Sequence, residues 1–394
     1  MHAREPWPGF LRAMIRIAVH SFGGPVAQIG VVHEELVERR AWIDEATFAR
    51  LLSFANVLPG PEALELVIHV GYLRRGIPGG VVAGLLFIAP GIVSLTLLGW
   101  LYLEYGSTHV VSMIQWAIRP VAVALVVAAA LRLSRKLLHT VPAFAIATVT
   151  LLASHYFGLP FVLILIAGAI LGVAIPQSKE LPVRHSTLAA IGLIIAAITI
   201  GAVARPQHDP SPPLSNVAPF APPTLGDIAL LNLKTALVTF GGAYTALPYL
   251  REQVVDRLRW MPDGAMLDAL ALGETTPGPL ISIGVFVSYL AGGLPGALVG
   301  AFFLFLPSFV LVLSLARFFD RIVAVPGIVR TLEGVLATTI GLILALIIDV
   351  VGGIAAIGPA LIAAAAFSAV TFLRASPVLV VLFATIGAVL IALL

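Results

Sequence analysis

Long apolar stretches without a charged residue alternate along the chain with short clusters of charged residues. Five of these stretches are each about long enough to form a helix that crosses a bilayer, which takes ~20 residues. They cover residues 76–103, 156–178, 186–204, 350–373 and 375–394. A longer stretch, residues 275–316, has room for more than one element. This pattern predicts an all-α polytopic membrane protein.

The composition excludes a soluble globular protein. Of 394 residues, 59% are hydrophobic and 11% are charged, and the mean hydropathy is +1.04. A soluble domain carries roughly 25% charged residues. We therefore expect the lipid bilayer to be the main environment of the chain.

Charge and cysteine content narrow the possible functions further. The net charge of +3 comes mostly from loop arginines, which we attribute to membrane topology and not to nucleic-acid binding. Cysteine is absent, which excludes disulfides and thiolate metal sites. The N-terminal segment lacks the pattern of a cleaved signal peptide. We expect a multipass protein of the cell inner (plasma) membrane, with no metal and no cofactor.

The chain contains an internal duplication. Residues 205–223 hold seven prolines in nineteen positions and predict a linker between an N-terminal repeat, residues 1–204, and a C-terminal repeat, residues 224–394. A shift of 218 aligns residues 21–43 with residues 239–261 and superimposes their Phe-Gly-Gly and Trp positions. Such internal repeats are typical of transporters.

Basic residues indicate that the two halves are inverted. Arg74 and Arg75 come before the apolar span that begins near Pro78. In the second half, Arg317 and Arg321 come after the equivalent span. Because basic residues favour the cytoplasmic side, this reversal predicts two inverted homologous halves.

Two elements in each half predict broken or re-entrant half-helices. An apolar stretch stops at Phe-Gly-Gly, which brings in Gly23 and Gly24 and then Gly241 and Gly242. A second, short apolar helix begins at a Pro-Gly-Pro motif and has only about 15 residues, or ~22 Å. The hydrocarbon core is ~30 Å thick. The Pro-Gly-Pro residues are Pro59, Gly60, Pro61, Pro277, Gly278 and Pro279.

A duplicated Pro-Gly-Pro at a helix start predicts an anion site. Proline suits the first turn of a helix, and glycine lets a ligand approach the backbone. The free N–H groups and the helix dipole then attract negative charge. We expect these motifs and the two Gly-Gly pairs to bind the substrate. The alternative is that glycine and proline merely kink packed helices.

Polar residues beside these motifs extend the predicted site. We assign substrate binding to Asn56, Glu62, Thr275 and Thr276 as well, and a coupling or charge role to Glu65, His69, Lys234 and Glu274. Carboxylates inside a membrane are costly and tend to be functional, often as proton carriers. Glu62 has a simpler alternative, because an acid in the first turn favours the helix dipole.

The residues then resemble the chromate ion transporter family in its long, two-domain form. The motifs that carry the resemblance are SFGGPVAQI and VLPGPEALEL in the first half and TFGGAYTALPYL and ETTPGPLISIGVF in the second. The resemblance implies export of chromate, driven by the proton gradient, with sulfate as the related physiological anion. Gln28 departs from the pattern, because family members often have histidine there, and this concerns substrate preference more than the fold.

Alternative functions remain open at this point. A carrier for sulfate or another anion fits equally well, since sulfate and chromate share charge and shape. A membrane-embedded enzyme would need convergent catalytic groups, and the sequence offers none with useful spacing. A scaffold would explain neither the broken helices nor the intramembrane carboxylates. We expect no catalytic residues, an oxyanion and protons as partners, and leave a homodimer open.

Overall fold

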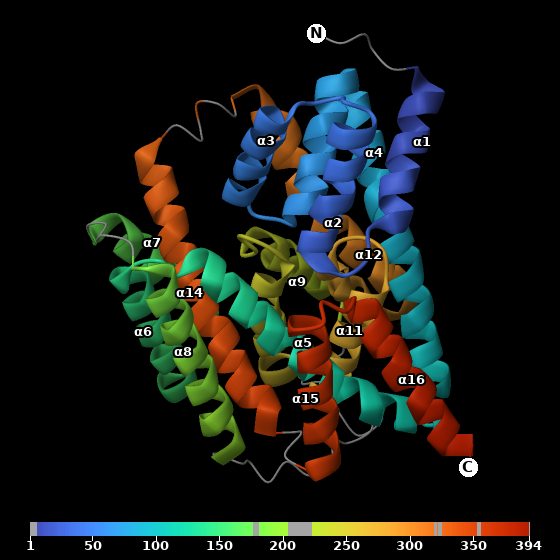
Figure 1. The fold of residues 1–394 in the computed structure, drawn as a ribbon. Helices are drawn as coiled ribbons and strands as arrows, with labels where there is room; N and C mark the ends of the chain where they lie inside the picture. The colour runs from blue at the N-terminus through green and yellow to red at the C-terminus, as the bar shows by residue number, and fades with distance from the viewer. Residues whose placement is uncertain are drawn as a thin grey trace. The chain divides into compact units, whose positions relative to one another are not determined.

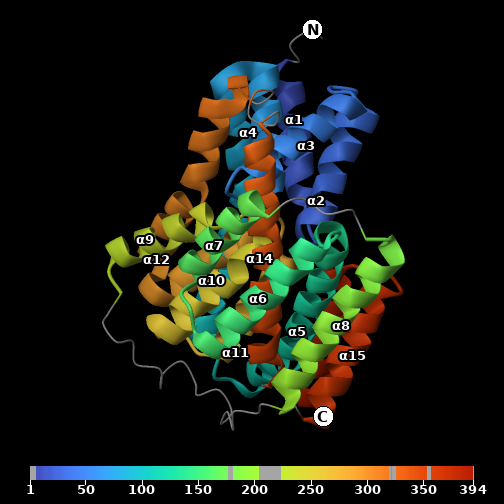
Figure 2. The ribbon, with the colours of Figure 1, turned by 90° about the vertical axis from the view of Figure 1, so that its left-hand side faces the viewer.

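In a computed structural model, the chain is helical throughout its described part (Figures 1 and 2). The described residues are 6–175, 181–203, 223–318, 321, 325–352 and 356–393. They contain no strand. The predicted linker, residues 205–223, lies outside the described residues except for Pro223.

The helices follow one another in the same order in the two halves. The first half contains α1 (Trp7–His20), α2 (Gly24–His33), η1 (Glu34–Arg39), α3 (Glu45–Val57), α4 (Glu62–Tyr105), α5 (His109–Leu137), α6 (Val141–Phe157), α7 (Phe161–Ala174) and α8 (Val183–Val203). The second contains α9 (Leu225–Leu237), η3 (Ala243–Ala246), α10 (Leu247–Arg251), η4 (Glu252–Arg257), α11 (Asp263–Thr275), η5 (Leu280–Ser282), α12 (Ile283–Leu315), η6 (Ala316–Phe318), α14 (Pro326–Val351), α15 (Ile357–Thr371) and α16 (Pro377–Leu393).

The helices of the first half match those of the second half at the positions that the sequence duplication predicts. At the shift of 218, the π-helix η1 falls on the π-helix η4, and α3 falls on α11 over its whole length. Helices α1, α4, α5, α6 and α7 correspond to α9, α12, α14, α15 and α16. Helix α8 has no counterpart among the described residues of the second half.

Both long helices, α4 and α12, are bent at equivalent positions. In α4 the bend lies at Arg75 (φ −143°, ψ 15°) and Gly76 (φ 65°, ψ −160°). In α12 it lies at Gly292 (φ −144°, ψ 20°) and Gly293 (φ 61°, ψ −154°). A positive φ is easy only for glycine, which explains why both bends contain one. The short helix predicted after each Pro-Gly-Pro is therefore the first arm of a bent helix.

The predicted fold class is confirmed: the protein is an all-α membrane protein of two inverted homologous halves with broken helices. Among the described residues, five helical segments are long and apolar enough to cross a membrane. They are Glu62–Tyr105, His109–Leu137, Val183–Val203, Leu280–Phe318 and Gly327–Val351.

Two of the predicted spans are wrong as single helices. Residues 156–178 divide at Gly158, which ends α6 in a left-handed conformation (φ 57°), and Pro160, which precedes α7. Residues 350–373 divide likewise, because α14 ends at Val351 and α15 begins at Ile357. The absence of charge marks apolar surroundings, but it cannot show where a helix stops.

The chain forms two compact units, and each combines segments of both halves. The first unit comprises Met1–Glu104, Ala221–Ala246 and Leu272–Val325, and the second comprises Tyr105–Phe220, Leu247–Ala271 and Pro326–Leu394. The division into repeats predicted from sequence thus differs from the division into compact units.

Small residues allow close helix packing in each unit. In the first, α9 packs along α12, where Asn232 Nδ2 donates to Ser288 Oγ at 2.8 Å. In the second, α14 lies beside α6, α7 and α8, as both views show (Figures 1 and 2). A Cβ added to Gly172 would come within 2.8 Å of the Gly334 Cα, so the backbones of α7 and α14 nearly touch there.

Candidate functional site

The two Pro-Gly-Pro motifs and the two Phe-Gly-Gly motifs are joined by reciprocal hydrogen bonds inside the first unit. The Gly60 N–H donates to the Thr239 carbonyl at 2.8 Å, and the Gly278 N–H donates to the Ser21 carbonyl at 2.9 Å. Gly60 and Gly278 are equivalent in the repeat, and so are Ser21 and Thr239. Each half therefore anchors its Pro-Gly-Pro loop on the other half, as a two-fold relation between inverted halves requires.

The glycines of these motifs have backbone conformations that other residues adopt rarely. Gly60 has φ +145° and Gly278 has φ +99°. The Gly-Gly pairs also have positive φ, at 83° and 79° for Gly23 and Gly24 and at 69° and 117° for Gly241 and Gly242. The sequence uses glycine at these positions because a side chain would strain the backbone.

Close packing is a second reason for glycine. A Cβ on Gly60 would collide with Ser308 Oγ and Glu65 Oε1. At the other Pro-Gly-Pro loop, a Cβ on Gly91 of α4 would lie 2.7 Å from the Pro277 carbonyl oxygen. Both Pro-Gly-Pro loops are thus packed against the second arm of the bent helix from the opposite half.

Three glutamates are buried around these motifs. Glu62 is 6% exposed, Glu65 is 1% exposed and Glu274 is 0% exposed. A Cβ on Gly24 would lie 3.5 Å from Glu274 Oε2, and a Cβ on Gly242 would lie 3.2 Å from Glu62 Oε2. Glu62 and Glu274 therefore each lie beside a Gly-Gly pair of the opposite half.

The hydrogen bonds to these carboxyl groups come from residues that the sequence did not single out. Tyr244 OH donates to Glu274 Oε1. Ser308 Oγ donates to Glu65 Oε1 at 3.3 Å, and Glu65 Oε2 has no hydrogen-bond partner among the described residues. The only sequence signal for Tyr244 and Ser308 is a hydroxyl group beside a duplicated glycine or proline motif in an apolar stretch.

Gln28 also belongs to this site. Its side chain is buried, and Nε2 donates to the Gly278 carbonyl at 2.6 Å. In the sequence, this position stands out only as a departure from a family pattern. Its contact with the Pro-Gly-Pro loop of the other half follows only from the tertiary structure.

The other predicted site residues lie at the edge of this cluster or outside it. Asn56, Thr275 and Thr276 donate to carbonyls within their own helical turn. His69 is buried on α4 and its ring packs edge-on against Phe54 at 5.3 Å. Lys234 is exposed on α9.

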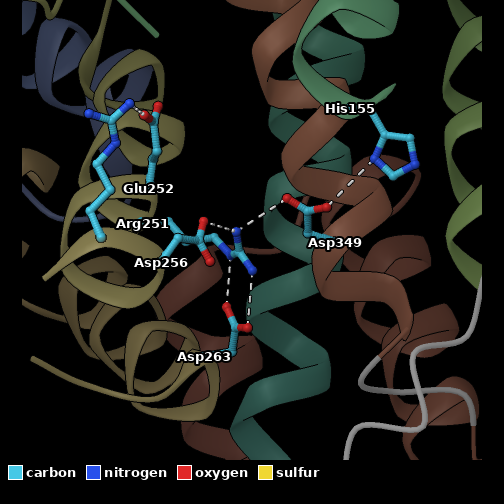
Figure 3. A network of polar contacts seen from close by, with 7 residues as sticks. His155, Arg251, Glu252, Asp256, Asp263 and Asp349 are labelled. Carbon is cyan, nitrogen blue, oxygen red and sulfur yellow. Dashed lines mark hydrogen bonds and ion pairs between the residues drawn. The ribbon is translucent and has the colours of Figure 1, made fainter. Parts of the chain in front are cut away.

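The second unit contains a separate ionic cluster centred on Arg251 (Figure 3). Its guanidinium binds both oxygens of Asp263, at 2.7 and 3.0 Å, and contacts Asp256 at 3.0 Å and Asp349 at 3.2 Å. His155 Nδ1 lies 3.8 Å from the other oxygen of Asp349. Burial opposes the charge of Arg251, but Asp263, Asp349 and Asp256 outweigh it and raise the pKa of Arg251.

The first half repeats this cluster with histidine in place of arginine. His33 is equivalent to Arg251, and it contacts Glu45 at 2.7 Å and Glu38 at 3.3 Å. These two glutamates are equivalent to Asp263 and Asp256. No group of three His, Cys, Asp or Glu side chains that could hold a metal ion occurs within the described parts of the chain.

Comparison with known proteins agrees with the duplicated architecture. The model of a family described as chromate transporter matches residues 9–173 and again residues 226–390. A chromate transport protein of Pseudomonas aeruginosa is 36% identical over 348 residues, covering 87% of this chain and 80% of the relative. A chromate transport protein of Cupriavidus metallidurans is 28% identical over 337 residues, covering 84% and 79%. No solved structure matches.

Proposed function

Because the chain belongs to the chromate transporter family, we propose that it exports chromate, a tetrahedral oxyanion, from the cell and that the proton-motive force drives the export. The proposal includes residence in the inner membrane and protons as the coupled partner. A homodimer is compatible with the proposal but is not needed for it, because the cluster of buried glutamates and glycine motifs lies within one chain.

The anion-binding part of the proposal rests on two reciprocal hydrogen bonds between the halves. The Gly60 N–H donates to the Thr239 carbonyl, and the Gly278 N–H donates to the Ser21 carbonyl. These bonds bring the starts of two half-helices from opposite halves into one compact unit. Backbone N–H groups at a helix start, together with the helix dipole, favour an anion. We propose that the oxyanion binds at these starts and at the adjacent Gly-Gly pairs.

Binding of the anion competes with hydrogen bonds between the halves. The Gly60 and Gly278 N–H groups already donate to carbonyls of the opposite half. An anion that uses these donors replaces the carbonyls and loosens the link between the halves. Such an exchange offers a simple route from binding to the conformational change of transport.

A carrier of sulfate is the second candidate. It uses the same site, because sulfate has the charge and tetrahedral shape of chromate. The relatives are named for chromate, which favours chromate as the first substrate to test.

The test is chromate uptake into inside-out vesicles, with and without a proton gradient, and with sulfate as competitor. We expect accumulation that depends on the gradient and is lost in Gly60→Leu and Gly278→Leu. The control is Gly192→Leu on α8, because nothing lies within 4 Å of a Cβ at Gly192. Vesicles that move sulfate but no chromate would leave the architecture intact and reject chromate as substrate.

A further inference from the structure

At the candidate site, two buried carboxyl groups each lie beside a glycine of the opposite half. Glu274 precedes the second Pro-Gly-Pro and lies against Gly24 of the first half. Glu62 follows the first Pro-Gly-Pro and lies against Gly242 of the second half. Gly24 and Gly242 are equivalent in the repeat, so the two contacts are related in space.

The two glutamates themselves are not equivalent in the repeat. Glu62 aligns with Leu280, and Glu274 aligns with Asn56. The same spatial arrangement is therefore reached from two different sequence positions, one on each side of a Pro-Gly-Pro motif. A packing accident has no reason to produce a carboxyl group twice at equivalent glycines, whereas a functional requirement for one does.

Each carboxyl group lies directly beside the position that a side chain on glycine would occupy. The ideal Cβ positions of Gly24 and Gly242 are 3.5 and 3.2 Å from the nearest carboxyl oxygens. An oxyanion that reaches the Gly-Gly backbone thus comes within a few ångströms of Glu62 and Glu274. Charges of the same sign at such a distance repel strongly in a buried site of low dielectric constant.

A carboxyl group can relieve this repulsion only by moving away or by accepting a proton. Glu62 and Glu274 are almost entirely buried, which limits movement into water. A proton removes the charge and also turns the carboxyl group into a donor that can bind an oxyanion.

We propose that Glu62 and Glu274 each take up a proton when the oxyanion binds at the Gly-Gly pairs, so that proton and anion strengthen each other's binding. The inference rests on the proposed function. It adds that proton binding and anion binding favour each other, and it names the residues that couple them. By linkage, an anion that promotes proton binding is itself bound more tightly as the pH falls.

Other titratable groups lie around the same motifs. Glu65 on α4 is buried beside Gly60, Tyr244 on η3 donates to Glu274, and His69 lies one turn beyond Glu65. The described basic residues of α1 and α9 are exposed, namely Arg12, Arg16, His20 and Lys234. Those of α2 and of the first arm of α4 lie far along their helices from the motifs, namely His33, Arg74 and Arg75.

The experiment is calorimetric titration of the purified full-length protein with sulfate and with chromate, in buffers of different ionisation enthalpy between pH 6 and 8. Sulfate is the cleaner probe, because chromate itself takes up a proton near neutral pH. We expect net proton uptake on binding and an affinity that rises up to about tenfold per pH unit for each proton taken up.

Substitutions then test which residues take up the protons. Glu62→Gln and Glu274→Gln should each reduce the uptake, and the double variant should bind sulfate without pH dependence. Glu104→Gln is the matched control, because Glu104 is exposed at the far end of α4. The wild-type measurement alone already tests the inference if a variant fails to fold.

The outcomes separate the two proposals. Anion binding with no proton uptake, or with proton release, overturns this inference and leaves the proposed function standing. Unchanged uptake in the double variant overturns the assignment to Glu62 and Glu274. No binding of either anion to the wild type overturns the proposed function and this inference together.

Discussion

At the scale of single residues, Gly60 and Gly278 are equivalent in sequence but differ in their surroundings. A Cβ on Gly60 collides with Ser308 and Glu65, whereas the nearest atom to a Cβ on Gly278 is the Phe87 carbonyl oxygen at 3.3 Å. Both have positive φ, so both substitutions cost backbone strain, but only Gly60 adds a severe clash.

We expect Gly60→Ala to lower stability by more than Gly278→Ala, which should cost about 1–3 kcal/mol from backbone strain. Chromate transport should fall at least ~10-fold in Gly60→Ala, because the clash displaces the carboxyl group of Glu65. Thermal unfolding in detergent and vesicle flux measure the two effects.

The matched control for this pair is Gly192→Ala in α8. A Cβ at Gly192 meets nothing within 4 Å, and alanine favours a helix by roughly 0.5–1 kcal/mol over glycine. Equal losses at Gly60 and Gly278 would show that the clash with Ser308 and Glu65 does not make Gly60 the more sensitive position.

Gln28 is the second residue whose role can be tested by matched variants. Gln28→Leu removes the donor to the Gly278 carbonyl and leaves that oxygen buried, which should cost about 1–3 kcal/mol. Gln28→His keeps a ring N–H and should retain most transport. Chromate and sulfate flux, measured side by side, would reveal any change of preference. Wild-type behaviour of Gln28→Leu would exclude a role for this hydrogen bond.

At the scale of elements, the π-helices η1 and η4 and the ionic clusters beside them are repeated in both halves. An ion pair spans each π-helix, between Glu34 and Arg39 at 2.6 Å and between Glu252 and Arg257 at 2.7 Å. The central cation differs, since the first half has His33 where the second has Arg251. Histidine can lose its charge between pH 5 and 8, whereas arginine cannot.

We expect Arg251→His to make the stability of the second unit depend on pH. A histidine that faces Asp256, Asp263 and Asp349 has its pKa raised in the folded state. Its stabilising charge is therefore fully present at low pH and is lost as pH rises through that value. The loss should amount to roughly 1–3 kcal/mol by pH 8.5, because one proton changes the free energy of unfolding by at most ~1.4 kcal/mol per pH unit.

The measurement is thermal unfolding between pH 5.5 and 8.5. Arg251→Lys is the control, since it keeps a positive charge over this range but loses the two-pronged contact with Asp263. A pH profile of Arg251→His parallel to that of Arg251→Lys would show that the charge of this residue does not stabilise the fold.

At the scale of the whole molecule, the two sequence halves are interleaved. The first unit needs α1–α4 from one half and α9 and α12 from the other. The second unit likewise needs α5–α8 together with α14–α16. Neither half contains all the elements of either unit.

We therefore expect residues 1–204 and 224–394 to be unstable when each is produced alone and to assemble when produced together. Buried apolar faces, such as that of α14 on α6 and α7, would be exposed when the other half is absent. Co-purification and chromate flux of the two-chain form provide the measurement. A full chain with a protease site in residues 205–223, cut after assembly, is the control, and a stable isolated half would contradict the interleaving.

The sequence by itself determined the class of the protein, its duplication and the helix breaks at the duplicated glycine and proline motifs. Charge-free stretches report a lipid environment, and duplicated glycines and prolines report backbone conformations, which are local properties of the chain. It did not determine the breaks at Gly158 and after Val351, because apolar composition continues across them. It also named Glu62, Glu65, Glu274 and the Pro-Gly-Pro motifs, but as separate positions.

Only the tertiary structure decided which of these positions meet. The contacts of Glu274 with Gly24 and of Glu62 with Gly242 do not follow the alignment of the repeats, and neither does the hydrogen bond of Gln28 to Gly278. The same holds for the addition of Asp349 to the Arg251 cluster. Such pairings join residues far apart in the chain, and they depend on how the bent helices pack, which no local pattern of hydrophobic and polar residues encodes.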